Sequence, residues 1–191
     1  MTFSIAARCP RTGRLGVGAL TARPAVGKLV AHVQSGAGAV AAQATPNPFV
    51  AYDGLPLLGE GRSPEDVLSE LLARDPGREV RQVGMVERQG HSYAFTGSRT
   101  RDWAGHHTGP GYAVQGNRLV GPETLAAIVG AFDDSRGLDL VERLVRVDDA
   151  EHPALELRRL YGVFQAEVLP TIEQLPTRED PMGEAARQAS R

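Results

Sequence analysis

The sequence is poor in several features, and each shortage excludes a class of protein. Its 191 residues include one cysteine, Cys9, which excludes an internal disulfide and a cysteine-based metal cluster. No apolar run approaches the roughly 18 residues of a membrane-spanning helix, and the first residues lack the basic and apolar segments of a signal peptide. A formal net charge of −2 gives no electrostatic reason to expect nucleic acid or a membrane as partner. We therefore expect a cytoplasmic protein.

The composition is that of an ordinary globular domain. Hydrophobic residues make up 41% of the chain, and a chain of this length buries a full core without disulfides or metals. The last part, residues 170–191, is rich in Pro, Glu, Arg and Gln, so we expect it to be a flexible tail. No internal repeat is present.

Period-two alternation of apolar residues predicts several strands. Residues 2–8 and 15–22 flank a turn that contains Pro10 and Gly13, which predicts a hairpin. A second hairpin is predicted around Gln89-Gly90, and Trp103-Ala104-Gly105 is interpreted as loop. The strands of the second hairpin are predicted at 79–88 and 91–97. Two further strands are predicted at 35–44 and 111–117, and the segment 25–34 fits either a strand or a short helix.

Capping residues and prolines predict the helices. The clearest helix is 63–74, where Ser63 is the N-cap, Pro64 follows at the first position, and acidic residues complement the helix dipole. Further helices are predicted at 49–61, 121–135, 137–147 and 152–165. Local connections favour antiparallel strand pairing, and sheets covered by helices give an α+β fold.

The second residue of the chain, Thr2, has a chemical use if Met1 is removed, which methionine aminopeptidases do before small residues. Thr2 then carries a hydroxyl nucleophile and an α-amine whose reference pKa is about 7.7–8.0. The neutral amine can act as general base for the hydroxyl. An oxyanion hole is still needed. The alternative is that Met-Thr has no chemical meaning, as in many chains, although the strand that follows is suited to aiming a terminal residue.

The sequence resembles the family called domain of unknown function 1028 (DUF1028), which is regarded as part of the N-terminal nucleophile (Ntn) hydrolase superfamily. The resemblance implies a four-layer αββα sandwich of two antiparallel sheets, with Thr2 as nucleophile. It implies a reaction type, hydrolysis of a C–N amide or related acyl bond, rather than a substrate. It rests on ordered blocks between residue 2 and about residue 145, which include MTFSIAAR, RLGVGALTARPAVG, SGAGAVAAQATPNP and GYAVQGNRLVGPE.

The chain departs from the family pattern after residue 144. Leu144 runs almost directly into Val147-Asp148-Asp149, where the family has a longer stretch. The resemblance therefore implies that one strand and a polar loop are absent; either that part is dispensable, or the chain is a degenerate or specialised member. We divide the chain into an Ntn-hydrolase-like domain, 1–146, a helical appendage that resembles a segment labelled peptidoglycan-binding, 147–169, and the tail, 170–191.

Two further residues are candidates for catalysis. Asn117 follows Gly116, which permits close backbone approach, and its side-chain amide is a suitable oxyanion donor; alternatively, it is an ordinary turn asparagine. Thr21, at the end of the second strand, either orients the Thr2 amine or is simply a β-branched strand residue. Backbone amides around Gly36-Ala37-Gly38 are further candidates for the oxyanion hole.

Four residues are candidates for substrate binding, each with a structural alternative. Arg23 suits a carboxylate or is a solvated loop residue. Lys28 either lowers the pKa of the hydroxyl or is merely exposed. His32 titrates near neutrality or is a satisfied structural histidine. Gln43 points into a cleft or pairs with backbone.

These residues lead to two hypotheses. In the first, the protein is an Ntn-type hydrolase of a small-molecule or peptide substrate, needs no cofactor or metal, and forms a homodimer. In the second, it is a non-catalytic binding or assembly protein on the same fold. His106, His107 and Asp102 resemble metal ligands, but no third cluster supports a metal site.

Overall fold

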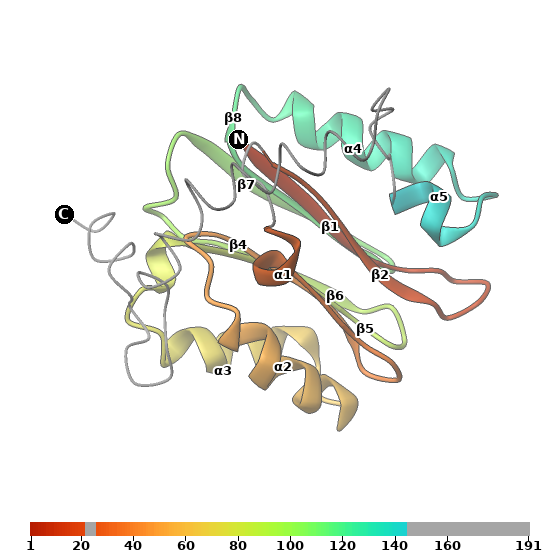
Figure 1. Ribbon diagram of the computed structural model, residues 1–191, viewed down its shortest axis with the longest axis horizontal. Coiled ribbons are helices and arrows are strands. Elements are labelled where there is room, and N and C mark those ends of the chain that lie inside the picture. The colour runs from red at the N-terminus through yellow and green to blue at the C-terminus, as the bar shows by residue number, and fades with distance from the viewer. Residues whose placement is uncertain (22–25, 145–191) are drawn as a thin grey trace, which may run out of the picture.

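The computed structural model describes residues 1–21 and 26–144, which form two antiparallel sheets (Figure 1). The first sheet has the strand order β2-β1-β8-β7, with β1 (Thr2–Arg8), β2 (Leu15–Thr21), β7 (Trp103–Gly109) and β8 (Tyr112–Leu119). The second has the order β3-β4-β5-β6, with β3 (Ala31–Gln34), β4 (Gly38–Ala44), β5 (Arg81–Glu87) and β6 (Ser92–Thr96). The predicted α+β fold with two antiparallel sheets is confirmed.

Helices cover the outer face of each sheet, so the layers run helix, sheet, sheet, helix (Figure 1). The second sheet is covered by α2 (Phe49–Gly59) and α3 (Pro64–Ala73). The first is covered by α4 (Glu123–Asp134) and α5 (Leu140–Leu144). A short helix, α1 (Gly27–Val30), precedes β3, and a 3₁₀ turn, Arg78–Val80, precedes β5.

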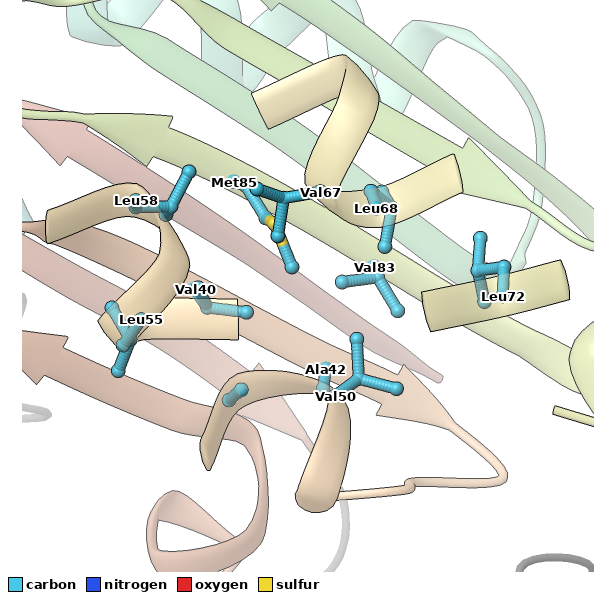
Figure 2. Packing of buried hydrophobic residues seen from close by; sticks show 11 residues of the cluster. Val40, Ala42, Val50, Leu55, Leu58, Val67, Leu68, Leu72, Val83 and Met85 are labelled. Atoms are coloured by element: carbon cyan, nitrogen blue, oxygen red, sulfur yellow. The ribbon is translucent and has the colours of Figure 1, made fainter. Parts of the chain in front are cut away.

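The outer core beneath α2 and α3 is apolar (Figure 2). Val40, Val83 and Met85 of the strands lie against leucines and valines of the two helices. Ser63 is the N-cap of α3, as the sequence predicts, and it accepts a hydrogen bond from Asp66 N–H at 3.1 Å. Each such buried aliphatic side chain stabilises the fold by about 1.5–3 kcal/mol.

Two segments differ from, or refine, the expectation from sequence. Residues 25–34, which fit either a strand or a helix, contain both, because α1 leads directly into β3. Trp103-Ala104-Gly105, expected as loop, lies in β7, so that interpretation was wrong. Glycines and two histidines obscure the apolar alternation of β7. The predicted helix at 152–165, the appendage 147–169 and the tail 170–191 lie outside the described residues.

Alternation along β1 separates the two faces of the first sheet. Phe3, Ile5 and Ala7 belong to the outer core with α4 and α5. Ser4 and Ala6 face the second sheet instead: Ser4 Oγ donates to a β4 side chain, and Ala6 packs against residues of β4 and β5. Because strand side chains alternate with period two, Thr2 shares the inner face with Ser4 and Ala6.

Ala44 ends β4 in a left-handed conformation, with φ of 72°. This conformation costs a non-glycine residue about 1–2 kcal/mol, a cost that glycine avoids. Glycine also raises the conformational entropy of the unfolded chain, which lowers the stability of the protein by about 0.4–1 kcal/mol. We therefore expect Ala44→Gly to raise the free energy of unfolding by about 0.5 kcal/mol. Urea denaturation measures this change. The control is Ala19→Gly, at an exposed strand position of β2 without positive φ, which should destabilise the protein.

Candidate functional site

Three neighbouring strands bring three predicted site residues into one row. β1 lies between β2 and β8, and its first residue, Thr2, pairs with Thr21 on one side and with Asn117 on the other. The hydroxyl oxygens of Thr2 and Thr21 are 2.9 Å apart, a hydrogen-bond distance in which either group can donate. Both threonines are partly exposed, whereas Asn117 is buried. The start of β1 therefore presents a hydroxyl, a second hydroxyl and an amide next to one another.

A β-bulge positions Asn117. The β7–β8 register pairs Trp103 with Leu119 but Gly105 with Gly116, so two residues of β8 lie opposite one residue of β7. The extra residue is accompanied by a left-handed backbone at Arg118, with φ of 54°. A bulge re-aims the side chains beside it. Asn117 keeps its pairing with Thr2 on β1 while the other edge of β8 is distorted.

The amide of Asn117 is held from the opposite sheet. Its Nδ2 donates to Gln82 Oε1 of β5 at 3.1 Å, and Gln43 Nε2 of β4 donates to the same oxygen at 2.8 Å. Among the described residues, Gln82 is the one hydrogen-bond partner of the Asn117 side chain. Gln43 and Gln82 are buried, at 2% and 0% relative exposure. Asn117 therefore faces the space between the sheets in a fixed orientation.

The same row of polar groups continues deeper between the sheets. Ser4 Oγ donates to Gln43 Oε1 at 2.7 Å and accepts from Gln115 Nε2 at 2.6 Å. Gln115 Oε1 is buried and has no hydrogen-bond partner among residues 1–21 and 26–144. A Cβ at Gly84 would collide with this oxygen, so the glycine makes room for the glutamine. We call the following set the inter-sheet polar layer: Ser4, Gln43, Gln82, Gln115 and Asn117. All five residues are uncharged.

One ionisable side chain is linked to this layer from the edge strands. Gln82 Nε2 donates to Thr96 Oγ1 of β6 at 3.0 Å, and that oxygen lies 2.9 Å from His106 Nδ1 of β7. Burial, with a smaller contribution from the neighbouring His107, lowers the pKa of the His106 imidazole below its ordinary value. Both causes favour the neutral form of the His106 imidazole.

Of the other predicted residues, the structure shows His32 to lie away from this row. His32 lies opposite Val40, a residue of the outer core, and its ring contacts Tyr52 of α2 at a centroid distance of 5.0 Å. It therefore lies on the face of its sheet that points away from Thr2. Lys28 is exposed on α1, with no hydrogen bond to Thr2 or Asn117 among the described residues. Arg23 lies outside the described residues.

The backbone amides expected near the oxyanion lie at the far end of β4. Gly38 begins this strand and Gln43 nearly ends it, a span of about 16 Å at ~3.3 Å per residue. Ala37 N–H is also engaged, by Gln34 O at 3.1 Å. The expectation for Gly36-Ala37-Gly38 was therefore wrong, because strand direction takes this turn away from Thr2.

Sequence reasoning missed three members of the polar layer: Ser4, Gln82 and Gln115. A signal existed, because each is a polar residue at a position that strand alternation assigns to a buried face. Within residues 1–21 and 26–144, no group of three or more His, Cys, Asp or Glu side chains is arranged to hold a metal ion. No helix in this part of the chain is long and apolar enough to span a membrane.

Comparison with known proteins gives a family but no activity. Residues 2–154 match the model of the Family of unknown function (DUF1028). The fold is similar to the crystal structure of a protein from Silicibacter pomeroyi that carries the same family label, with 28% sequence identity and a TM-score of 0.72. That alignment covers 95% of this chain and 98% of the other. No curated protein matches the chain.

Proposed function

We propose, from the premise that the chain belongs to the DUF1028 family, that it is an Ntn-type hydrolase of an amide or related acyl bond. The observation that carries the proposal is the row of Thr2, Thr21 and Asn117 at the first residue of a central strand. The layered arrangement of helices and sheets is the one that the Ntn superfamily implies. This supports the proposal, and so does the uncharged, hydrogen-bonded surrounding of Asn117.

The proposed reaction needs no group beyond this chain and water. After loss of Met1, Thr2 Oγ1 attacks the substrate carbonyl, and the Thr2 α-amine accepts the hydroxyl proton. The second N–H of Asn117 Nδ2 stabilises the oxyanion. The amine then returns the proton to the leaving group as the C–N bond breaks. Water, activated by the same amine, hydrolyses the resulting ester and regenerates Thr2.

Thr21 supports the nucleophile through its hydroxyl. Its oxygen lies 2.9 Å from Thr2 Oγ1, so it selects the rotamer in which the hydroxyl points into the row. Because Thr2 lies on the inner face of its sheet, the attack in this proposal occurs on the side that faces the second sheet. The side chain of Met1 is exposed, at 53%, which gives an aminopeptidase access to the residue that blocks the amine.

The test combines mass spectrometry with an electrophile. Intact mass shows whether Met1 is removed. A β-lactone then acylates the chain: Thr2 Oγ1 forms an ester as the lactone C–O bond opens, and the proton passes to the released alkoxide. We expect one adduct, located on Thr2 by fragmentation.

The matched control is the same chain with an uncleaved N-terminal tag. It keeps the hydroxyl and loses the free amine, so its acylation should fall by about 10²–10⁴-fold, the usual contribution of a positioned base. A folded protein that lacks Met1, resists the lactone and hydrolyses no amide in a substrate panel would contradict the proposal. That result would favour a non-catalytic binding protein.

A further inference from the structure

Building on the hydrolase proposal, we propose that Gln82, on the opposite sheet, is the positioning residue that fixes the polarity of the Asn117 amide. Gln82 belongs to β5, whereas Thr2, Thr21 and Asn117 belong to the first sheet. Its contact with the site is a single hydrogen bond, from Asn117 Nδ2 to Gln82 Oε1 at 3.1 Å. Gln82 itself touches no reacting atom in the proposed mechanism, so its role is orientation.

The orientation of the Gln82 amide follows from its surroundings. Gln82 Nε2 lies 2.8 Å from Gly116 O, 3.1 Å from Gly105 O and 3.0 Å from Thr96 Oγ1. The two carbonyl oxygens accept and never donate. An amide rotated by half a turn would place its own oxygen against both carbonyls. The nitrogen of Gln82 must therefore face β7 and β8, and its oxygen must face Asn117.

The orientation of Asn117 follows in turn. Gln82 Oε1 accepts from Asn117 Nδ2 and from Gln43 Nε2. If the Asn117 amide were rotated by half a turn, its Oδ1 would face Gln82 Oε1. Both oxygens are hydrogen-bond acceptors, so neither could donate to the other and the buried contact would be unfavourable. Asn117 must therefore present Nδ2, which has a second N–H to offer the oxyanion. The carbonyl oxygens of Gly116 and Gly105 thus fix the orientation of the Gln82 amide, and Gln82 in turn orients Asn117 so that its N–H donor faces the site.

Removal of Gln82 takes away this selection without changing the nucleophile. In Gln82→Met, Asn117 is free to rotate, and its carbonyl oxygen then repels a developing oxyanion. The matched control is Gln115→Met, which makes the same change at a fully buried position of the same layer. Gln115 is hydrogen-bonded to Ser4, and no hydrogen bond joins it to Asn117 among the described residues.

Two reagents separate orientation from general damage. β-Lactone acylation generates an oxyanion. Periodate cleaves the Cα–Cβ bond of an N-terminal threonine with a free amine, is reduced to iodate, and requires no oxyanion hole. We expect Gln82→Met to lower the acylation rate by about 10–100-fold, below the ~10²–10³-fold typical of losing an oxyanion donor outright, with periodate cleavage unchanged. Gln115→Met should stay within about twofold of wild type in both reactions.

Equal losses of acylation in the two variants, or none in Gln82→Met, would overturn the inference. Wild-type protein that periodate cleaves but the lactone does not acylate would instead contradict the hydrolase proposal. In that case nuclear magnetic resonance tests the orientation directly. We expect the two Asn117 side-chain amide protons to differ in solvent exchange in wild type, one slow and one fast, and to become alike in Gln82→Met.

If Gln82→Met does not fold, the nuclear magnetic resonance spectrum of the wild-type protein alone tests the orientation of the Asn117 amide. A nuclear Overhauser contact should then join the slow Asn117 proton to the Gln82 side chain. Equal exchange of both protons, without that contact, would contradict the inference.

Discussion

We expect Thr2→Ala to abolish acylation by the β-lactone and Thr2→Ser to keep the acylation rate within about tenfold of wild type, which corresponds to a change of at most ~1.4 kcal/mol in activation free energy. Alanine removes the proposed nucleophilic oxygen but is compatible with a free α-amine, because methionine aminopeptidases remove Met before alanine as they do before threonine. Serine keeps the hydroxyl, the amine and the hydrogen bond to Thr21, and loses only the methyl group. The measurement is the adduct mass at residue 2 over time.

The stability of the fold separates this loss from unfolding. Thr2 is partly exposed at a strand end, and Thr2→Ala removes one hydrogen bond, worth about 0.5–1.5 kcal/mol. The variant should therefore melt close to wild type. Acylation that persists in Thr2→Ala at the wild-type rate would place the reactive group elsewhere and contradict the mechanism.

We expect Asp75→Ala to lower the free energy of unfolding by about 3–5 kcal/mol, because it removes one partner of a buried ion pair. Asp75 Oδ2 accepts from Arg81 Nε at 2.9 Å, and the side chains are 3% and 1% exposed. The same carboxylate accepts from Asn47 Nδ2 and from Gly77 N–H. Alanine removes the Asp75 carboxylate from the buried guanidinium, which keeps its hydrogen bond to Thr45 O at 2.9 Å.

Denaturant unfolding measures this loss, and two comparisons assign its cause. Arg14→Ala breaks an exposed ion pair with Asp139 and should cost about 0–1 kcal/mol. The double variant Asp75→Leu with Arg81→Met removes both charges, so it should be less destabilised than Asp75→Ala alone. A double variant that is less stable than Asp75→Ala would show that the loss does not come from an uncompensated charge at Arg81, contrary to our expectation.

The elements that sequence predicts best are those with local signals. The cap at Ser63 and the turns at Gly13 and Gly90 locate α3 and the two hairpins, because each depends on neighbours in the chain. Thr2 and Thr21 share a hairpin, so their proximity follows from the β1–β2 register. Asn117 joins them through the pairing of β1 with β8, which no local pattern specifies.

What the sequence could not predict depends on which face a residue occupies and which strand lies opposite. His32 follows the short helix α1, and a shift of one residue in β3 would place its side chain on the other face. Gln82 belongs to no motif, and its proposed role rests on a contact between the two sheets. The bulge at Asn117 and Arg118 is visible only once β7 is recognised as a strand. The catalytic roles of Thr2, Thr21 and Asn117 stay predictions.

The inter-sheet polar layer has a consequence for how the two sheets are aligned. Two sheets that pack through purely apolar faces can shift relative to each other at little cost. The side chains lose dispersion contacts in one position and form similar contacts in the next. Hydrogen bonds such as Gln43–Gln82 and Ser4–Gln43 are directional, and a slide by one residue would leave buried amides unpaired. The inter-sheet polar layer therefore favours a single alignment of the two sheets. We expect a variant in which aliphatic side chains replace the whole layer to form a compact state in which the two sheets adopt several relative alignments.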